Sequence, residues 1–359
     1  MAWKHTTTTT TTITLFFLLI TTSTSTTSTT DPYTPGPLNS THIHISAVVT
    51  IDLQEELDVW VPTEPGTFGT VYFIDSFGGY TPGSLYQEFG HFLASHGFAL
   101  VVPWSLSLPV NPVDKVPIFA SVLAWAEEHL EEKLHEKGVD EGVHLDLDNL
   151  VLSGHSAGSH VLVEYLKGGC GKVKAQVFVS PVDGVDPLGL IPEFCINPGE
   201  YLNYGLPTMH IEGGFDSLPG SSGVACAPLE LSNIRFYNAV DPKLAGKWHL
   251  NTTQFGHADL LDDEAIAFVE SSSFCAWNPN LSLADHDAYR RFVGGSMVLF
   301  MNAVFSNDEA ACGSYLSYLQ DPTLMNIEVT NFYDNPSGLC PTPTCTWSPL
   351  PTTTTTTTT

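Results

Sequence analysis

The sequence predicts an α/β fold: an eight-stranded, mostly parallel sheet with helices on both faces. Between about His42 and Phe305, short runs rich in β-branched and aromatic residues alternate with longer runs whose apolar residues recur at helical spacing. This alternation is typical of parallel strands joined by crossover helices. The chain has 359 residues, 43% of them hydrophobic, which is enough to bury one large core.

Eight segments have the length and composition of strands. β-Branched and aromatic side chains pack well in a sheet that is covered on both faces, and turn-forming residues separate the segments. In chain order they are residues 42–51, 57–61, 70–74, 99–102, 150–152, 175–179, 208–211 and 250–254.

Amphipathic helices are predicted between these strands. In two segments the apolar residues recur three and four positions apart, which is the spacing of one helix face. They are Leu85, Phe89, Phe92 and Leu93 in the first segment and Phe119, Val122, Leu123, Ala126 and Leu130 in the second. Residues 292–305 are apolar on nearly all sides, which predicts a helix packed deeply against the sheet.

Both ends of the chain differ in composition from its middle. Residues 1–22 contain an apolar stretch too short to cross a bilayer as a helix, which is typical of a signal peptide. Residues 23–40 form a Ser/Thr/Pro-rich spacer, residues 41–335 the folded domain, and residues 336–359 a Pro/Thr-rich tail expected to be disordered. We therefore expect a protein that is secreted or resides in the secretory lumen, without a stable membrane anchor.

Cysteines and glycosylation sequons agree with this route. The chain has seven cysteines, so one is free or pairs outside the chain. Cys340 and Cys345 could close a small loop with each other, and the remaining pairings stay open. Asn39, Asn251 and Asn280 lie in Asn-X-Ser/Thr sequons that are glycan acceptors in the secretory pathway.

The net charge argues against one class of partner. With 39 acidic against 12 basic residues, the formal charge of −27 repels phosphate backbones and anionic membrane surfaces. We therefore expect no nucleic-acid partner. The acidic run 262–264 is better explained by capping of a helix N-terminus than by metal binding, and we expect neither a metal nor another cofactor.

The strongest local motif is Gly154-His155-Ser156-Ala157-Gly158. It follows the predicted strand 150–152 and precedes a helical stretch at 159–166. A Gly-X-Ser-X-Gly motif between a strand and a helix is the nucleophile elbow of the α/β-hydrolase fold, which the sequence therefore predicts. The glycines permit a tight turn that strains the serine backbone and exposes its hydroxyl at the carboxyl edge of the sheet. Ser156 is the predicted nucleophile.

A serine nucleophile needs a general base and a carboxylate that orients the base. His257 follows the last predicted strand, where this fold places its triad histidine. Two residues are alternatives for the acid: Asp216 after the strand 208–211 and Asp183 after the strand 175–179. Asp216 is favoured because Asp183 lies well beyond its strand end, past a proline.

The oxyanion hole is expected to combine two backbone N–H groups, those of Ala157 and Phe77. Phe77 lies in the loop 75–79 after the third predicted strand. The apolar segment 218–231 is expected to line an acyl or alcohol pocket.

Several motifs resemble the chlorophyllases, esterases that remove phytol from chlorophyll. The resemblance covers approximately residues 41–305, and implies the α/β-hydrolase fold with Ser156 and His257 in the triad. It rests on Ser95-His96-Gly97-Phe98, the Gly-His-Ser elbow, Pro181-Val182-Asp183-Gly184, Cys226-Ala227-Pro228, Gly256-His257 followed by Leu261-Asp262-Asp263, and Arg290-Arg291-Phe292-Val293-Gly294-Gly295.

The chain departs from the family pattern at three places. Ala157-Gly158-Ser159 replaces an arginine and two glycines after the nucleophile, and Asp75-Ser76 replaces a His-Gly pair before the oxyanion loop. The resemblance implies a catalytic aspartate immediately before Pro181, and this chain has Ser180 at that position. Because a serine cannot stabilise an imidazolium as a carboxylate does, either the acid has moved or activity is low.

The sequence thus predicts a serine carboxylic-ester hydrolase that acts through an acyl-enzyme on a bulky hydrophobic ester such as chlorophyll. The alternatives are a secreted lipase or polyester-type esterase and a non-catalytic, hydrolase-like binding protein.

Overall fold

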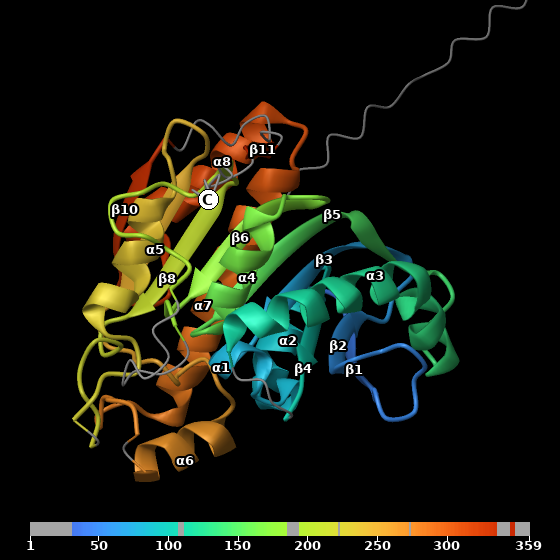
Figure 1. Cartoon of the computed structure of the whole chain (residues 1–359), viewed down its shortest axis with the longest axis horizontal. Helices are drawn as coiled ribbons and strands as arrows, with labels where there is room; N and C mark the ends of the chain where they lie inside the picture. Colours follow the sequence, from blue (N-terminus) through green and yellow to red (C-terminus); the bar gives the residue numbers. More distant parts are fainter. Residues whose placement is uncertain are drawn as a thin grey trace, which may run out of the picture. The chain divides into compact units, whose positions relative to one another are not determined.

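One large, mostly parallel sheet organises the fold (Figure 1). The computed structural model describes residues 31–106, 111–184, 194–221, 223–272, 274–335 and 345–348. The expected signal peptide at 1–22 and the spacer up to residue 30 lie outside the described residues. The strands of the sheet follow the order β1-β2-β4-β3-β5-β6-β8-β9-β10.

Parallel pairing brings the strand ends that matter for function to one edge. The strands from β4 through β3, β5, β6 and β8 to β9 are parallel, whereas β2 is antiparallel to β1 and β4, and β10 is antiparallel to β9. Their bounds are β1 (Ser40–Ile45), β2 (Glu56–Pro62), β3 (Gly66–Ile74), β4 (Phe98–Trp104), β5 (Val143–His155), β6 (Val173–Val179), β8 (Thr208–Gly213), β9 (Lys247–Thr252) and β10 (Thr330–Asp334).

Helices cover both faces of the sheet. Alternate residues of one strand point to opposite faces, so Val71 and Phe73 of β3 belong to the core that includes residues of α2, α7 and α8, while Tyr72 belongs to the core that includes residues of α3 and α4. The helices are α1 (Ser76–Gly79), α2 (Gln87–Ser95), α3 (Pro112–Glu136), α4 (Gly158–Lys167), α5 (Asn233–Ala239), α6 (Asp263–Ser272), α7 (Leu283–Phe305) and α8 (Glu309–Gln320). Among the helices described, none has the length and apolarity to cross a bilayer.

The fold class is the predicted one, but the sheet has nine strands instead of eight. The missed strand is β10, an edge strand whose Phe332 and Tyr333 are 40% and 41% exposed, so the sequence lacks the buried pattern that reveals a strand. The predicted strand 42–51 ends early, at Ile45, because the apolar residues that follow lie in an exposed loop.

Two segments predicted to lie outside the folded domain pack onto it. Tyr33, in the predicted spacer, is buried and stacks on Phe292. In the predicted tail, β11 (Thr346–Trp347) pairs with β7 (Tyr204–Gly205). A short apolar or aromatic anchor inside a low-complexity stretch is enough to attach it to a core that the composition alone does not reveal.

Disulfides connect segments that are distant in sequence. Cys345 is bonded to Cys170, so the predicted pairing of Cys345 with Cys340 is wrong. A second disulfide joins Cys226 and Cys275, and Cys195 is buried as a free thiol. The short spacing between Cys340 and Cys345 suggested that they pair with each other. The fold instead brings Cys170 to the C-terminal segment, which spacing along the chain does not reveal.

Candidate active site

The turn between β5 and α4 holds Ser156 in a strained conformation. Ser156 has a φ of 55°, in the left-handed region that non-glycine residues rarely adopt. A side chain at Gly158 would place its Cβ 2.1 Å from the carbonyl oxygen of Ile74, and one at Gly154 would lie 2.7 Å from the backbone nitrogen of Ser159. Both elbow glycines are therefore required by close packing around the turn.

His257 lies within hydrogen-bond distance of the serine. Its Nε2 is 2.9 Å from the Ser156 hydroxyl oxygen. The loop between β9 and α6 carries His257, whose ring is buried. Burial lowers the pKa of His257 well below its usual range, and the neighbouring His155 ring lowers it further. The imidazole is therefore neutral near pH 7, as a general base must be.

His155, inside the elbow motif, supports the His257 loop. Its Nε2–H donates to the carbonyl oxygen of His257 at 2.8 Å, while its Nδ1 accepts from the hydroxyl of Tyr86 at 2.9 Å. Burial lowers the pKa of His155 to about 4, so the ring stays neutral and keeps this tautomer. The sequence motif placed His155 beside the nucleophile without revealing this contact.

Asp216 is the carboxylate on the far side of the His257 ring. Its Oδ1 lies 3.9 Å from His257 Nδ1, and neither atom has a hydrogen-bond partner among the described residues. Its Oδ2 accepts from the backbone N–H of Gly213 at 3.0 Å. Burial raises the pKa of Asp216 well above its usual range, and the Ser180 hydroxyl opposes that rise. A shift of about 1 Å would bring Asp216 from 3.9 Å to hydrogen-bond distance of the imidazole, and catalytic hydrogen bonds that are long without substrate often tighten when it binds.

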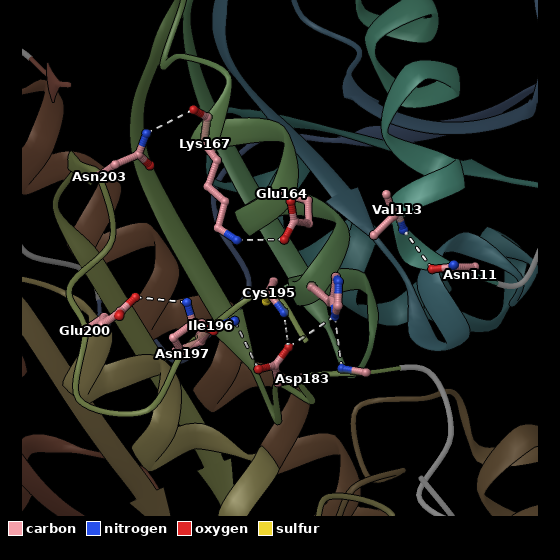
Figure 2. Close-up of polar contacts among 12 residues, drawn as sticks. Asn111, Val113, Glu164, Lys167, Asp183, Cys195, Ile196, Asn197, Glu200 and Asn203 are labelled. Atoms are coloured by element: carbon pink, nitrogen blue, oxygen red, sulfur yellow. Dashed lines mark hydrogen bonds and ion pairs between the residues drawn. The ribbon is translucent and has the colours of Figure 1, made fainter. Parts of the chain in front are cut away.

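Asp183 is engaged elsewhere (Figure 2). Its two oxygens accept from the backbone N–H groups of Cys195 at 2.7 Å and Ile196 at 3.2 Å. The carboxylate also forms an ion pair with Arg235 at 2.7 Å. The Nδ1 of His160, which accepts from the N–H of Gly184, lies 3.2 Å from Asp183 Oδ1. Of the two predicted acids, the structure therefore brings only Asp216 to the ring of His257.

The group His160, Asp183 and Cys195 is the only set of potential metal ligands found in the described part of the chain. The guanidinium of Arg235 already neutralises Asp183 from 2.7 Å. A bound cation would have to displace or repel this charge, so the arrangement fits a buried ion pair better than a metal site.

A small apolar pocket opens in front of Ser156. Phe77, the predicted oxyanion donor, lines it together with the nucleophile, while Ala157 follows Ser156 at the start of α4. The segment expected to line the pocket, 218–231, contributes Cys226. The lining consists of Ser76, Phe77, His155, Ser156, Val182, Cys226, His257, Ala258, Leu261, Val269, Phe274 and Cys275.

Two motifs without an assigned role meet behind this site. Arg290, buried in α7, donates to the carbonyl oxygen of Leu261 and to Asp263, both at 2.9 Å. Asp262 accepts from the backbone N–H groups of Gln87 at 2.7 Å and Glu88 at 3.1 Å, at the start of α2. The acidic run thus lies at helix N-termini, as the sequence predicted: Asp262 caps α2, while Asp263 and Glu264 lie in the first turn of α6. These contacts anchor the segment after His257.

Fold and site together define an α/β-hydrolase with a serine elbow. A family model described as Chlorophyllase matches residues 28–332, and the chain belongs to this family. The chain is 30% identical to Chlorophyllase type 0 of Chenopodium album over 71% of its length and 72% of that relative. It is 27% identical to Chlorophyllase-1 of Arabidopsis thaliana, covering 67% and 73%, and 27% identical to the chloroplastic Chlorophyllase-1 of Citrus unshiu, covering 76% and 78%.

Proposed function

We propose that the chain is a serine carboxylic-ester hydrolase in which Ser156 is the nucleophile, His257 the general base and Asp216 the triad acid. The observation that carries this proposal is the 2.9 Å contact between Ser156 Oγ and His257 Nε2 at a strained elbow. Family membership supports the reaction class, since the named relatives are chlorophyllases.

The proposed reaction has two halves. Ser156 Oγ attacks the ester carbonyl carbon and its proton passes to His257 Nε2, while Asp216 stabilises the imidazolium. The N–H groups of Ala157 and Phe77 bind the oxyanion. When the C–O bond breaks, His257 returns the proton to the departing alcohol. Water then attacks the acyl-enzyme with His257 again as base, which releases the carboxylic acid and restores Ser156.

The proposed substrate is a bulky hydrophobic ester, with chlorophyll as the example that the family name suggests. The apolar residues Val182, Leu261, Val269 and Phe274 line the pocket next to Ser156 and favour an alkyl group there. Product analysis after incubation with chlorophyll, beside a short-chain ester, tests activity and substrate class together. Hydrolysis of triglycerides or polyesters in preference to chlorophyll would support the lipase-type alternative.

Covalent labelling tests the nucleophile. A fluorophosphonate probe should label the wild-type chain, and Ser156→Ala should remove both label and esterase activity with the fold intact. Ser121→Ala, at a partly exposed serine of α3, is the matched control and should keep both. EDTA should leave activity unchanged. Ester hydrolysis that survives Ser156→Ala would contradict the proposal, and a chain that is neither labelled nor active would fit the non-catalytic binding protein.

A further inference from the structure

A disulfide forms part of the pocket wall beside Ser156. Cys226 and Cys275 both line the pocket, and they are 9% and 6% exposed. Their neighbours in the wall are Val269 of α6 and Phe274. Since sulfur and the aromatic ring are apolar, this side of the pocket contacts the hydrocarbon part of a ligand.

The cross-link joins two segments that support different triad residues. On one side, the N–H of Ala227 donates to the carbonyl oxygen of Asp216 at 3.0 Å, which places Cys226 next to the acid's turn. On the other side, the carbonyl of Ala276 packs against Gly256, where an added Cβ would lie 2.8 Å away. The disulfide therefore spans from the turn of Asp216 to the segment packed on the His257 loop.

The α6 side of the wall is only partly buried, although Ala265 and Val269 pack against the core and Arg290 binds Asp263. Ile266 is the one buried residue of α6, and Phe268 is 72% exposed. Phe274 is 46% exposed although it lines the pocket, so burial alone does not fix its ring. The covalent bond at Cys275, the next residue, adds a restraint directly beside Phe274.

We propose that the Cys226–Cys275 disulfide determines substrate specificity by holding Phe274 against the pocket, which limits the width of the ester's alcohol chain. The proposal rests on the ester-hydrolase function proposed above. The cavity of about 80 Å³ is small compared with the roughly 300 Å³ or more of pockets that enclose whole ligands. It admits a slender alkyl chain next to Ser156, while a ring system stays outside. We expect that without the cross-link Phe274 moves outward and that alcohols branched at their second carbon then enter.

Reduction of the wild-type enzyme tests the cross-link while keeping the size of both side chains. Hydrolysis of two isomeric esters, pentyl butanoate and neopentyl butanoate, is followed by pH titration with and without a mild reductant. The ratio of kcat/KM for the linear ester to kcat/KM for the branched ester should fall about tenfold or more on reduction. This is the range by which one methyl or methylene group in an apolar pocket changes discrimination between substrates.

Two paired-cysteine variants isolate the bond. Cys226→Ala/Cys275→Ala should already show the low preference and should not respond to reductant. Cys170→Ala/Cys345→Ala, which removes the disulfide at the C-terminal segment, should keep the wild-type preference and its response to reductant. An unchanged ratio on reduction, or an equal loss in the Cys170/Cys345 variant, would overturn the proposal.

Phe274→Ala gives a second test that does not depend on folding without the cross-link. Because Phe274 is half exposed, its truncation should lower the linear preference as reduction does, and reduction should then add little. Additive effects would show that the disulfide acts through another residue and would refute the proposed wall. If the wild-type enzyme hydrolyses neither ester and Ser156 is not labelled, the proposed ester-hydrolase function is wrong. If both esters are hydrolysed but the ratio of their kcat/KM values does not change on reduction, only the role of the disulfide in specificity is refuted.

Discussion

At the residue scale, the identity of the triad acid has the largest consequence. Asp216→Asn removes the charge that stabilises the His257 imidazolium and favours the wrong tautomer, so kcat should fall by ~10³–10⁴-fold with little change in KM. Steady-state hydrolysis of p-nitrophenyl butanoate measures both constants.

Asp183→Asn is the control for that substitution. Its carboxylate pairs with Arg235, so the change should lower the free energy of unfolding, measured by urea titration, while the folded enzyme keeps kcat within a few-fold of wild type. The reverse pattern, with Asp183→Asn inactive and Asp216→Asn active, would return the triad role to the neighbouring strand.

The buried histidine also sets a pH dependence. Its pKa is lowered from 6.5 by burial, so His257 remains a neutral base below pH 6.5 and kcat/KM should begin to fall only at more acidic pH. Because the pKa of Asp216 is raised as well, the decline of kcat/KM at acidic pH reports the coupled titration of Asp216 and His257. The lowered pKa of His257 also affects stability. Because the unfolded state binds a proton at His257 more readily than the folded state, the contribution of His257 to the free energy of unfolding is complete above pH 6.5 and is lost as the pH falls.

A pH–rate profile between pH 4 and 8 with a neutral ester checks this prediction. An acid limb centred above pH 6.5 would show that the ring of His257 is more solvated, or more strongly paired, than its buried position implies.

At the element scale, α7 and α2 hold the loop that carries His257. Arg290→Met removes the hydrogen bond to the carbonyl of Leu261, so the loop should loosen and kcat should fall by ~10–10²-fold, as small misplacements of a catalytic group do. The next residue, Arg291, pairs with Asp287 at the surface of α7, and Arg291→Met should leave kcat unchanged. Equal losses in both variants would mean that helix stability, and not the Leu261 contact, is responsible.

The sequence could predict those elements whose local residue pattern favours the same structure that their tertiary environment requires. The elbow strand, Ser156 and His257 follow from the Gly-X-Ser-X-Gly motif and chain order, because the chemistry demands that geometry. The contacts of Asp262 and Arg290 were beyond prediction, since they join helices far apart in the chain. The edge strand β10 was missed because its side chains face solvent.

At the scale of the whole molecule, the proposed secretory route makes a prediction about glycans. Asn39 and Asn280 are exposed, whereas Asn251 lies in β9 between β8 and β10 and its Oδ1 is buried. A glycan at Asn251 would obstruct the sheet, so chain recovered from a secreting host should carry glycans at Asn39 and Asn280 only. Mass spectrometry of glycosidase-treated peptides measures occupancy at each site. Occupied Asn251 in folded protein would contradict the packing of β9, and a secreted chain with three empty sequons would contradict their use.

Ser180 directly follows β6 and has a φ of 45°, and its N–H donates to the carbonyl of Ile211 in β8 at 2.7 Å. The family pattern implies an aspartate here, while Asp216 lies beyond the end of the adjacent strand. If Asp216 is the triad acid, as proposed, the ends of these two adjacent strands can each carry the carboxylate that faces the imidazole. A lineage can gain the second aspartate before it loses the first, so the triad can change strands in single substitutions without any ancestor lacking an acid.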